Sequence, residues 1–184
     1  MKINEIFYSL QGEGYWTGTP MVFVRFAGCN LKCPFCDTQH EGYTEMSTEE
    51  IVEAILQYPA ERVCLTGGEP TLQVTEAFVE ALHEEGLTVH IETNGTRPIP
   101  DSIEWVTLSP KGDCVVASCN ELKLLYPCDP TDYLAIEADH RFLQPIATND
   151  PEETQQNTDE AIDFILSQPW WRLSLQTHKY LDIK

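Results

Sequence analysis

Short apolar runs, each followed by a polar motif, recur along the chain and alternate with segments of helical periodicity. They predict strands over residues 21–27, 63–66, 88–93, 105–109, 121–126 and 141–145, and a short final strand over 172–175. Strands that alternate with helices form βα units and a parallel sheet. This alternation places the chain in the α/β class. Its 184 residues are too few for the eight units of a complete barrel. The expected architecture is an incomplete, open (β/α)6-type barrel with parallel strands and reduced helices, in a single domain, residues 1–184.

Two helices are predicted in the first half of the chain. Ser47 and Glu50 form a capping box before a run with apolar residues at helical spacing over 51–56. A second helix is predicted over residues 75–85, where Gly86 ends it. Both would cover the sheet with one apolar face.

The second half of the chain has weaker helical signals. Its last helix is expected to begin near residue 158, after a polar and acidic surface loop over 149–157. The connections over 112–120 and 127–140 are too short or too irregular for full-length helices. No internal repeat or low-complexity segment interrupts the pattern.

Polar motifs stand at the predicted C-terminal ends of the strands, for example Gly67-Gly68-Glu69-Pro70 and Gln176-Thr177-His178-Lys179. Ligands bind at this edge in parallel α/β folds. Arg25 lies inside the first apolar strand. A cation there needs a buried acid or a bound carboxylate as its partner.

Three cysteines, Cys29, Cys33 and Cys36, follow the first strand with the spacing C-x3-C-x2-C. Soft thiolates at this spacing favour an iron–sulfur cluster, copper(I) or zinc over a hydrophobic core. A structural zinc site normally has four ligands, and His40 would close this one only at a cramped and unusual spacing. Three ligands on a [4Fe–4S] cluster would leave one iron open, which is a catalytic arrangement.

The composition of the chain limits the kinds of molecule that it is expected to bind. The formal charge of −19 repels phosphate backbones, so we expect no direct nucleic-acid binding. The chain has no apolar run near the ~20 residues of a membrane span and no evident secretory leader, so we expect a cytoplasmic protein. Its few bases include Arg25, Lys111 and Lys179 within motif-like stretches, where they pair with an anionic ligand or with an ordinary carboxylate.

The other cysteines match no ligand spacing and are expected to be small buried hydrophobes; they are Cys64, Cys114, Cys119 and Cys128. Reduced thiols are the expected state in the cytoplasm, so the chain's cysteines, seven in all, are not interpreted as a disulfide framework.

The cysteine motif, with Phe35 just before its last thiol, resembles the signature of the radical S-adenosylmethionine superfamily. Residues 67–70 resemble the superfamily's second motif, whose backbone and carboxylate hold the methionine ammonium group. Within the superfamily, the chain is similar to the 7-carboxy-7-deazaguanine synthase family. The stretches that carry this similarity run from near the first residue to near the last, over 9–14, 25–30, 36–38, 109–111, 144–145 and 176–179.

The resemblance implies three bound groups. Cys29, Cys33 and Cys36 would hold a [4Fe–4S] cluster whose open iron takes S-adenosylmethionine. The residues implied to contact that cofactor are Phe35, Cys36, Asp37, Gly68, Glu69, Ser109, Pro110, Lys111 and Gln144. Thr38 would ligate Mg²⁺ beside the substrate carboxylate, with Asp37 as an alternative or outer ligand.

The substrate implied by the resemblance is 6-carboxy-5,6,7,8-tetrahydropterin. Its implied contacts are Leu10, Gln11, Gly12, Arg25 and Thr66. Two residues are implied to be catalytic. Glu13 would accept hydrogen bonds from the pterin N–H groups, and His178 would pair with the substrate or transfer a proton.

The implied reaction is a radical ring contraction in 7-deazapurine (queuosine-type) biosynthesis. A hydrogen atom is removed from C6 of the pterin, the six-membered ring contracts, and ammonia is lost to give 7-carboxy-7-deazaguanine. The implied partners are a flavodoxin-like or ferredoxin-like electron donor and a second copy of the chain in a homodimer.

Two other functions fit the cysteine motif. A glycyl-radical-enzyme activase, or another radical S-adenosylmethionine enzyme, shares the three thiols but has no use for Gln11, Glu13 and Arg25 together. A non-enzymatic electron-transfer or zinc-binding module would instead hold a fully ligated metal.

Overall fold

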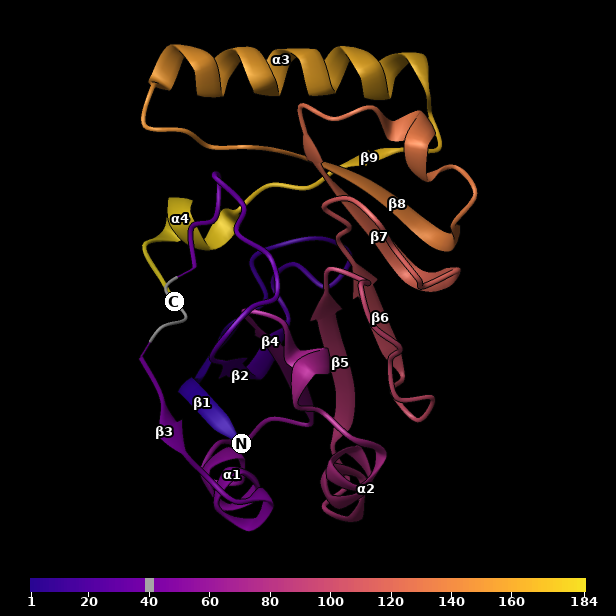
Figure 1. Cartoon of the computed structure of the whole chain (residues 1–184). Helices are drawn as coiled ribbons and strands as arrows, with labels where there is room; N and C mark the ends of the chain where they lie inside the picture. The colour runs from indigo at the N-terminus through magenta and orange to yellow at the C-terminus, as the bar shows by residue number, and fades with distance from the viewer. Residues whose placement is uncertain (39–41) are drawn as a thin grey trace.

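The computed structural model describes residues 1–38 and 42–184, and its central element is one curved sheet (Figure 1). Within the described residues the sheet has nine strands in the order β3-β1-β2-β4-β5-β6-β7-β8-β9. Their bounds are β1 Lys2–Leu10, β2 Pro20–Phe26, β3 Thr44–Glu45, β4 Arg62–Gly67, β5 Thr88–Thr93, β6 Trp105–Leu108, β7 Ser118–Tyr126, β8 Glu137–Pro145 and β9 Arg172–Leu173.

Neighbouring strands pair parallel from β2 through β4, β5, β6, β7 and β8 to β9, which confirms the predicted sheet. The order ends at β3 on one edge and β9 on the other, so the described strands form an open sheet. Two strands that were not predicted extend one edge of this sheet in the antiparallel sense, because β1 pairs antiparallel with β2, and β3 pairs antiparallel with β1. The two strands β1 and β2 are close in sequence, and an antiparallel pair needs only a short connection.

Four α-helices are described: α1 Thr48–Ile55, α2 Glu76–Glu84, α3 Pro151–Ser167 and α4 Thr177–Leu181. The capping box at α1 is confirmed, since the Ser47 side chain accepts from the Glu50 N–H and the Glu50 side chain accepts from the Ser47 N–H. Short 3₁₀ turns over Pro70–Leu72 and Pro130–Tyr133 complete the helical content. The prediction of reduced helices after β6 and β7 is therefore confirmed.

The predicted surface loop over 149–157 was wrong, because α3 already begins at Pro151. Asp150 caps this helix by accepting from the Glu152 N–H at 2.9 Å, and a proline at the first helical position favours the same start. The first two turns are polar because they face solvent. Asn157 is the exception, being buried and donating to the Ile146 carbonyl at 3.0 Å.

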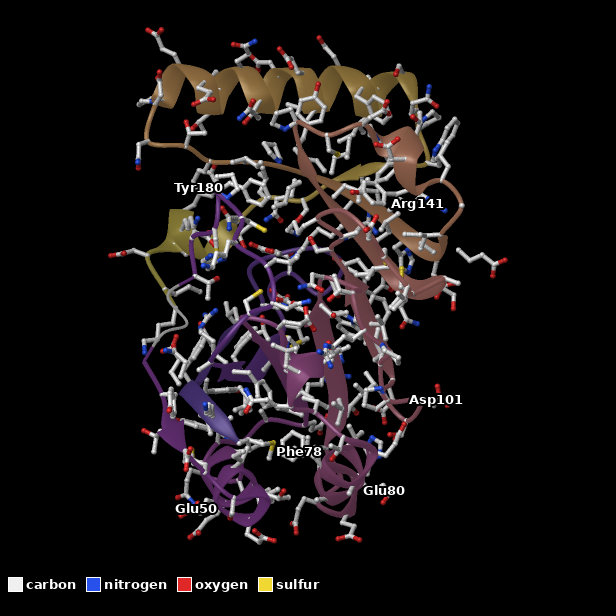
Figure 2. All side chains as sticks on the ribbon, viewed as in Figure 1. Glu50, Phe78, Glu80, Asp101, Arg141 and Tyr180 are labelled. Carbon is white, nitrogen blue, oxygen red and sulfur yellow. The ribbon has the colours of Figure 1, made fainter. Side chains whose placement is uncertain are left out.

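Three of the described helices, α1, α2 and α3, cover the outer face of the sheet. In β2, β4 and β5, every second side chain packs with α1 and α2 in one hydrophobic cluster. Phe78 of α2 points towards the sheet in Figure 2, whereas Glu80 points away from it. At the opposite end α3 lies alongside β8 and β9 over a second cluster (Figure 1). Among the described residues, no helix has both the length and the apolar character that crossing a membrane requires.

The inner face of the sheet carries a small apolar cluster towards the N-terminal ends of the parallel strands. Phe7, Met21, Phe23 and Cys64 form a third cluster there, and Trp16 from the loop after β1 packs against it. The connection from β1 to β2 therefore closes the base of the half-barrel interior. Polar inner residues further along the strands are left facing a cavity, which lies at the edge that the sequence predicted for ligands.

Candidate active site

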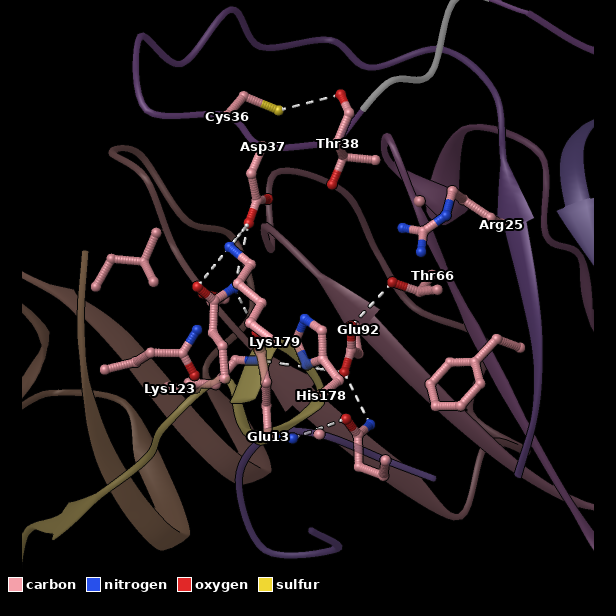
Figure 3. A pocket seen from close by; sticks show the side chains of 18 of the residues that line it. Glu13, Arg25, Cys36, Asp37, Thr38, Thr66, Glu92, Lys123, His178 and Lys179 are labelled. Atoms are coloured by element: carbon pink, nitrogen blue, oxygen red, sulfur yellow. Dashed lines mark hydrogen bonds and ion pairs between the residues drawn. The ribbon is translucent and has the colours of Figure 1, made fainter. Parts of the chain in front are cut away.

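A pocket of about 760 Å³ opens at the C-terminal ends of the strands (Figure 3). This volume lies within the usual range for small-molecule sites. Most of the predicted site residues line it: Leu10, Gln11, Gly12, Glu13, Arg25, Cys33, Phe35, Cys36, Asp37, Thr38, Thr66, Ser109, Lys111, Gln144 and His178. The cysteine loop lies on one side, and residues from β5, β7 and the chain's two end segments lie across from it.

Strand alternation brings the side chains into the pocket. Along a strand, successive side chains point to opposite faces. The outer-facing side chains pack in the hydrophobic clusters under the helices. The inner positions near the strand ends are then occupied by Arg25, Thr66, Glu92, Lys123 and Gln144. Parallel register sets them side by side, for example Arg25 beside Thr66.

Basic side chains concentrate at this pocket in an otherwise acidic protein. Five of the chain's 11 lysines and arginines line it: Arg25, Lys111, Lys123, Lys179 and Lys184. The expectation that rare cations gather at a ligand site thus agrees with their placement. Several of them also have carboxylate partners within the protein.

Arg25 is held by a carboxylate and faces the cavity. Its Nε donates to Glu5 Oε1 at 2.9 Å, while the outer nitrogens of the guanidinium point into the pocket (Figure 3). Burial raises the pKa of Glu5, but hydrogen bonds from Lys184 and Arg25 outweigh it and lower that pKa overall. An arginine fixed at Nε keeps its other donors for a carboxylate or a heterocycle edge.

Glu13 lies in the loop after β1 and forms an ion pair with Lys123 of β7. Its other carboxylate oxygen accepts from Gln176 Nε2 at 2.9 Å. Burial raises the pKa of Glu13, but the charge and hydrogen bond of Lys123 lower it overall. Glu13 is therefore an anion at the pocket wall near neutral pH.

Glu92, at the end of β5, is the second carboxylate of this wall. Its Oε1 accepts from Gln11 Nε2 at 3.1 Å, and its Oε2 accepts from Thr66 Oγ1 at 2.9 Å. Lys123 Nζ lies 4.0 Å from Glu92 Oε1. Two predicted substrate residues, Gln11 and Thr66, are thus oriented by an acid that the sequence reasoning did not assign.

The C-terminal segment joins the loop after β1 to the cysteine loop. Thr177 donates to the Gly12 carbonyl from its N–H and its hydroxyl, both at 2.9 Å. Lys179 Nζ donates to Asp37 Oδ2 at 2.7 Å, and Gln176 donates to the same oxygen at 3.2 Å. These contacts, drawn in part in Figure 3, bring His178 to the pocket.

The three thiols suit the expected cluster by their chemistry. Cys29, Cys33 and Cys36 are free, lie on one loop, and include two residues that line the pocket. Burial, and then the neighbouring thiols, raise the pKa of Cys33 against the opposing charge of Lys111. Within the described residues, no three Cys, His, Asp or Glu side chains stand in a preassembled metal-binding group. His40, the possible fourth ligand, lies outside the described residues.

Lys111 borders the cysteine loop from the strand-end loop after β6. Its Nζ donates to the Ser109 carbonyl at 2.7 Å and to the Ser109 hydroxyl at 2.6 Å. Burial, followed by repulsion from Lys123, lowers the pKa of Lys111 to about 8. A cation with this pKa remains mostly charged near neutral pH and can face an anionic group.

Four predicted residues are not among those that line the pocket: Cys29, Gly68, Glu69 and Pro110. Gly68 packs against the start of the cysteine loop so closely that an added Cβ would lie 1.9 Å from the Gly28 carbonyl oxygen. The Glu69 carboxylate is fully buried and accepts from Thr71, Thr93 and Asn94. In this structure that carboxylate braces the turn and does not face the cavity.

Several pocket residues escaped the sequence reasoning, namely Glu92, Lys123, Gln176 and Lys184. Lys123 could have been predicted as a site residue, because it is a lone cation inside an apolar strand, as Arg25 is. Gln176 lay within a stretch singled out for its resemblance, but it received no role. Lys184 reaches the pocket through a contact with Glu5 at 3.0 Å.

Comparison with known proteins adds independent information on the family. Over 186 residues the chain is 54% identical to the 7-carboxy-7-deazaguanine synthase of Bacteroides thetaiotaomicron, covering 100% of this chain and 98% of that protein. The chain belongs to the 7-carboxy-7-deazaguanine synthase family. A second member, from Bordetella pertussis, is 41% identical over 209 residues and covers 99% of this chain and 98% of its own length.

Structural comparison agrees with membership in the 7-carboxy-7-deazaguanine synthase family. The crystal structure of QueE from Escherichia coli matches with a TM-score of 0.79 and 30% identity, over 96% of this chain and 94% of that one. The family model of the Radical SAM superfamily matches residues 23–107, which include the cysteine motif. SuiB of Streptococcus suis, at 13% identity and a TM-score of 0.55, shares the fold alone.

These findings confirm the predicted family and the open-barrel fold. As a member of this family, the protein is a radical S-adenosylmethionine lyase whose cofactors are a [4Fe–4S] cluster and S-adenosylmethionine. It acts on a small molecule and requires a reductant. The activase and non-enzymatic alternatives are not supported by any of these matches.

Proposed function

We propose that this protein is a 7-carboxy-7-deazaguanine synthase. It would convert 6-carboxy-5,6,7,8-tetrahydropterin into 7-carboxy-7-deazaguanine with loss of ammonia, in 7-deazapurine (queuosine-type) biosynthesis. The observation that carries the proposal is the full-length similarity, at 54% identity, to a protein of that name. The pocket supports it, because residues implied to bind pterin converge there from both ends of the chain.

The pterin would lie against the wall formed by Glu13, Glu92 and Arg25. Ionised carboxylates accept hydrogen bonds from the amino and ring N–H groups of a pterin, and these bonds are stronger than neutral ones. The free guanidinium donors of Arg25 match the substrate carboxylate in geometry and charge. Leu10 and Gly12 would contact the ring from the loop after β1.

The cysteine loop would hold the cluster through Cys29, Cys33 and Cys36. When bound, the cluster supplies the electron that splits S-adenosylmethionine, and this chemistry removes a hydrogen atom from C6 of the pterin. The chain's own contribution is to orient both molecules and to exclude water. The residues proposed to contact the cofactor from the pocket wall are Phe35, Cys36, Asp37, Ser109, Lys111 and Gln144. Gly68 and Glu69 would act through the backbone of their turn, and Pro110 through its place beside Ser109.

Thr38 is the proposed Mg²⁺ ligand, because its hydroxyl is a hard oxygen donor that lines the pocket. The Asp37 carboxylate has a partner in Lys179 at 2.7 Å, which favours Thr38 over Asp37 as the direct ligand. Mg²⁺ would fix the substrate carboxylate between Thr38 and Arg25. His178 is proposed to pair with the substrate or to transfer a proton.

Three further parts of the proposal concern the whole protein. Residues 1–184 would form a single radical S-adenosylmethionine domain. The electron donor would be flavodoxin-like or ferredoxin-like, and the protein would work as a homodimer in the cytoplasm. Each follows from the family resemblance.

An anaerobic assay with reconstituted protein, reductant, Mg²⁺ and the carboxypterin tests the proposal. The unsubstituted protein and the control Arg97→Ala, at an exposed residue away from the pocket, should form the deazapurine at equal rates. Arg25→Ala should keep its iron content but lose at least about a hundredfold in kcat/KM, since it removes a charge-assisted carboxylate contact. Reductive cleavage of S-adenosylmethionine without any deazapurine product would refute the function.

A further inference from the structure

Lys123 is a buried cation with no assigned role in the reaction. It lies on the inner face of β7 with only 5% of its surface exposed, and it lines the pocket. A lysine ammonium loses strong hydration when it is buried, so it persists only where anions compensate the loss. Its carboxylate neighbours therefore explain why it stays charged.

Three acidic residues face Lys123 from three parts of the fold. Glu13 forms the direct ion pair from the loop after β1, and Glu92 approaches to 4.0 Å from β5. Glu121 adds its charge from β7 itself. Lys111, from the loop after β6, adds a second cation, the Cys64 thiol faces these charges from β4, and the β8 contribution, Gln144, is neutral.

Glu13 and Glu92 are also the two acids of the pocket wall. Gln176 orients Glu13, while Gln11 and Thr66 orient Glu92. An ionised carboxylate accepts hydrogen bonds at both oxygens, whereas protonation turns one oxygen into a donor and removes the charge that strengthens the bonds. The charge on Glu13 therefore affects how strongly the wall accepts hydrogen bonds from a ligand.

We propose that Lys123 is a positioning residue that holds Glu13 and Glu92 together as anions, so that both accept hydrogen bonds from N–H groups of the substrate heterocycle. The nature of that heterocycle rests on the proposed function. Lys123 acts through the two acids and does not itself contact the substrate.

Removal of the Lys123 ammonium should change how readily the Glu13 carboxyl binds a proton. Without Lys123, the half-buried Glu13 carboxylate would face Glu92 and Glu121 with no neutralising cation between them, and like charges raise carboxyl pKa values. Burial already opposes ionisation of Glu13, and Lys123 is the largest influence that lowers its pKa. In Lys123→Met the Glu13 carboxyl should therefore keep its proton to a higher pH than in the unsubstituted protein.

Calorimetric binding of the carboxypterin to the reconstituted holoenzyme, across about pH 6 to 9, tests this inference. Below about pH 7.5 the unsubstituted protein should bind with an affinity that varies little with pH, because Lys111, with its pKa of about 8, stays mostly charged there. Lys123→Met should bind about ten- to a hundredfold more weakly at the acidic end, which is the loss expected for a charge-assisted hydrogen bond. Its affinity should recover towards the unsubstituted value as the pH rises and Glu13 loses its proton.

Two variants separate charge from shape. Lys123→Arg keeps the cation, so its pH profile should stay flat even if the larger side chain weakens binding at every pH. Lys2→Met, at an exposed lysine outside the pocket, should match the unsubstituted protein. A flat profile for Lys123→Met, or a sloping one for Lys123→Arg, would overturn the inference.

A second measurement covers the case in which Lys123→Met fails to fold. With ¹³C-labelled glutamate, the Glu13 carboxyl of the unsubstituted protein, assigned by comparison with Glu13→Gln, should titrate below its usual pKa. Titration of that carboxyl above about pH 6 would contradict the role of Lys123. If the unsubstituted protein itself fails to bind or convert the pterin, the proposed function fails, and the titration still decides the state of Glu13.

Discussion

Substitution of Gly12 by alanine should release the C-terminal segment from the pocket. A Cβ at Gly12 would lie 2.1 Å from His178 Nδ1 and 2.9 Å from His178 Cβ. Rotation of the imidazole relieves the first contact but not the second, because the backbone fixes the position of Cβ. The start of α4 must therefore move away from Gly12.

The two hydrogen bonds from Thr177 to the Gly12 carbonyl, both at 2.9 Å, set the size of the effect. At about 1 kcal/mol each, their loss costs about 2 kcal/mol. This energy raises the population of the undocked segment about thirtyfold. His178 and Lys179 would leave the pocket together with it.

Hydrogen exchange measured by mass spectrometry on peptides covering residues 176–184 reports this release directly, and KM for the pterin should rise in parallel. Gly42→Ala is the matched control, since the nearest atom to its added Cβ lies 4.0 Å away. Global unfolding by urea should change little in either variant. Exchange and KM equal to those of Gly42→Ala would refute the reasoning.

Two further predictions concern pH and metal. Burial, and then the charge of Arg62, lower the pKa of His90 from 6.5 to about 4, so below pH 6.5 the unfolded chain binds a proton that the folded chain does not. The free energy of unfolding should therefore fall by up to about 3 kcal/mol as the pH decreases from 6.5 to about 4. His90→Gln should remove this loss, which urea unfolding at several pH values would measure. The same pH dependence in both proteins would contradict the prediction. Removal of iron by a chelator should shift Tm by less than about 5 °C, because no cysteine of the loop belongs to the three clusters of buried hydrophobic residues; unfolding on chelation, as in zinc-dependent modules, would contradict it.

Local patterns account for most of what the sequence predicted correctly. The capping box at Ser47, the end of α2 before Gly86 and the strand at residues 88–93 each depend on neighbours within a few positions. The helix α3 was placed too late because its first turns are polar, and apolar periodicity cannot detect a helix that faces solvent. The strand β1 was not predicted, because an irregularity between Ile3 and Glu5 breaks the alternation of apolar side chains along it.

Buried polar partners were the part that local patterns could not supply. Glu69 sits in a motif that resembles a cofactor-binding turn, yet its carboxylate accepts hydrogen bonds from Thr93 and Asn94, which follow in the next strand-end motif. Nothing in either motif indicates the partner. Only the parallel arrangement of β4 and β5 brings the two turns together.

By itself, the sequence determined the chemistry available to this protein. Three thiols at C-x3-C-x2-C, a lone arginine in an apolar strand and polar motifs at strand ends are local facts that folding does not alter. The tertiary structure alone decided which charges meet. Lys123 and Glu13 are 110 positions apart, and Gln176 and Glu13 are 163 apart. Such pairs form because the sheet register and the curvature of the sheet bring distant strands together. The residues next to a given position in the sequence do not determine either of these features.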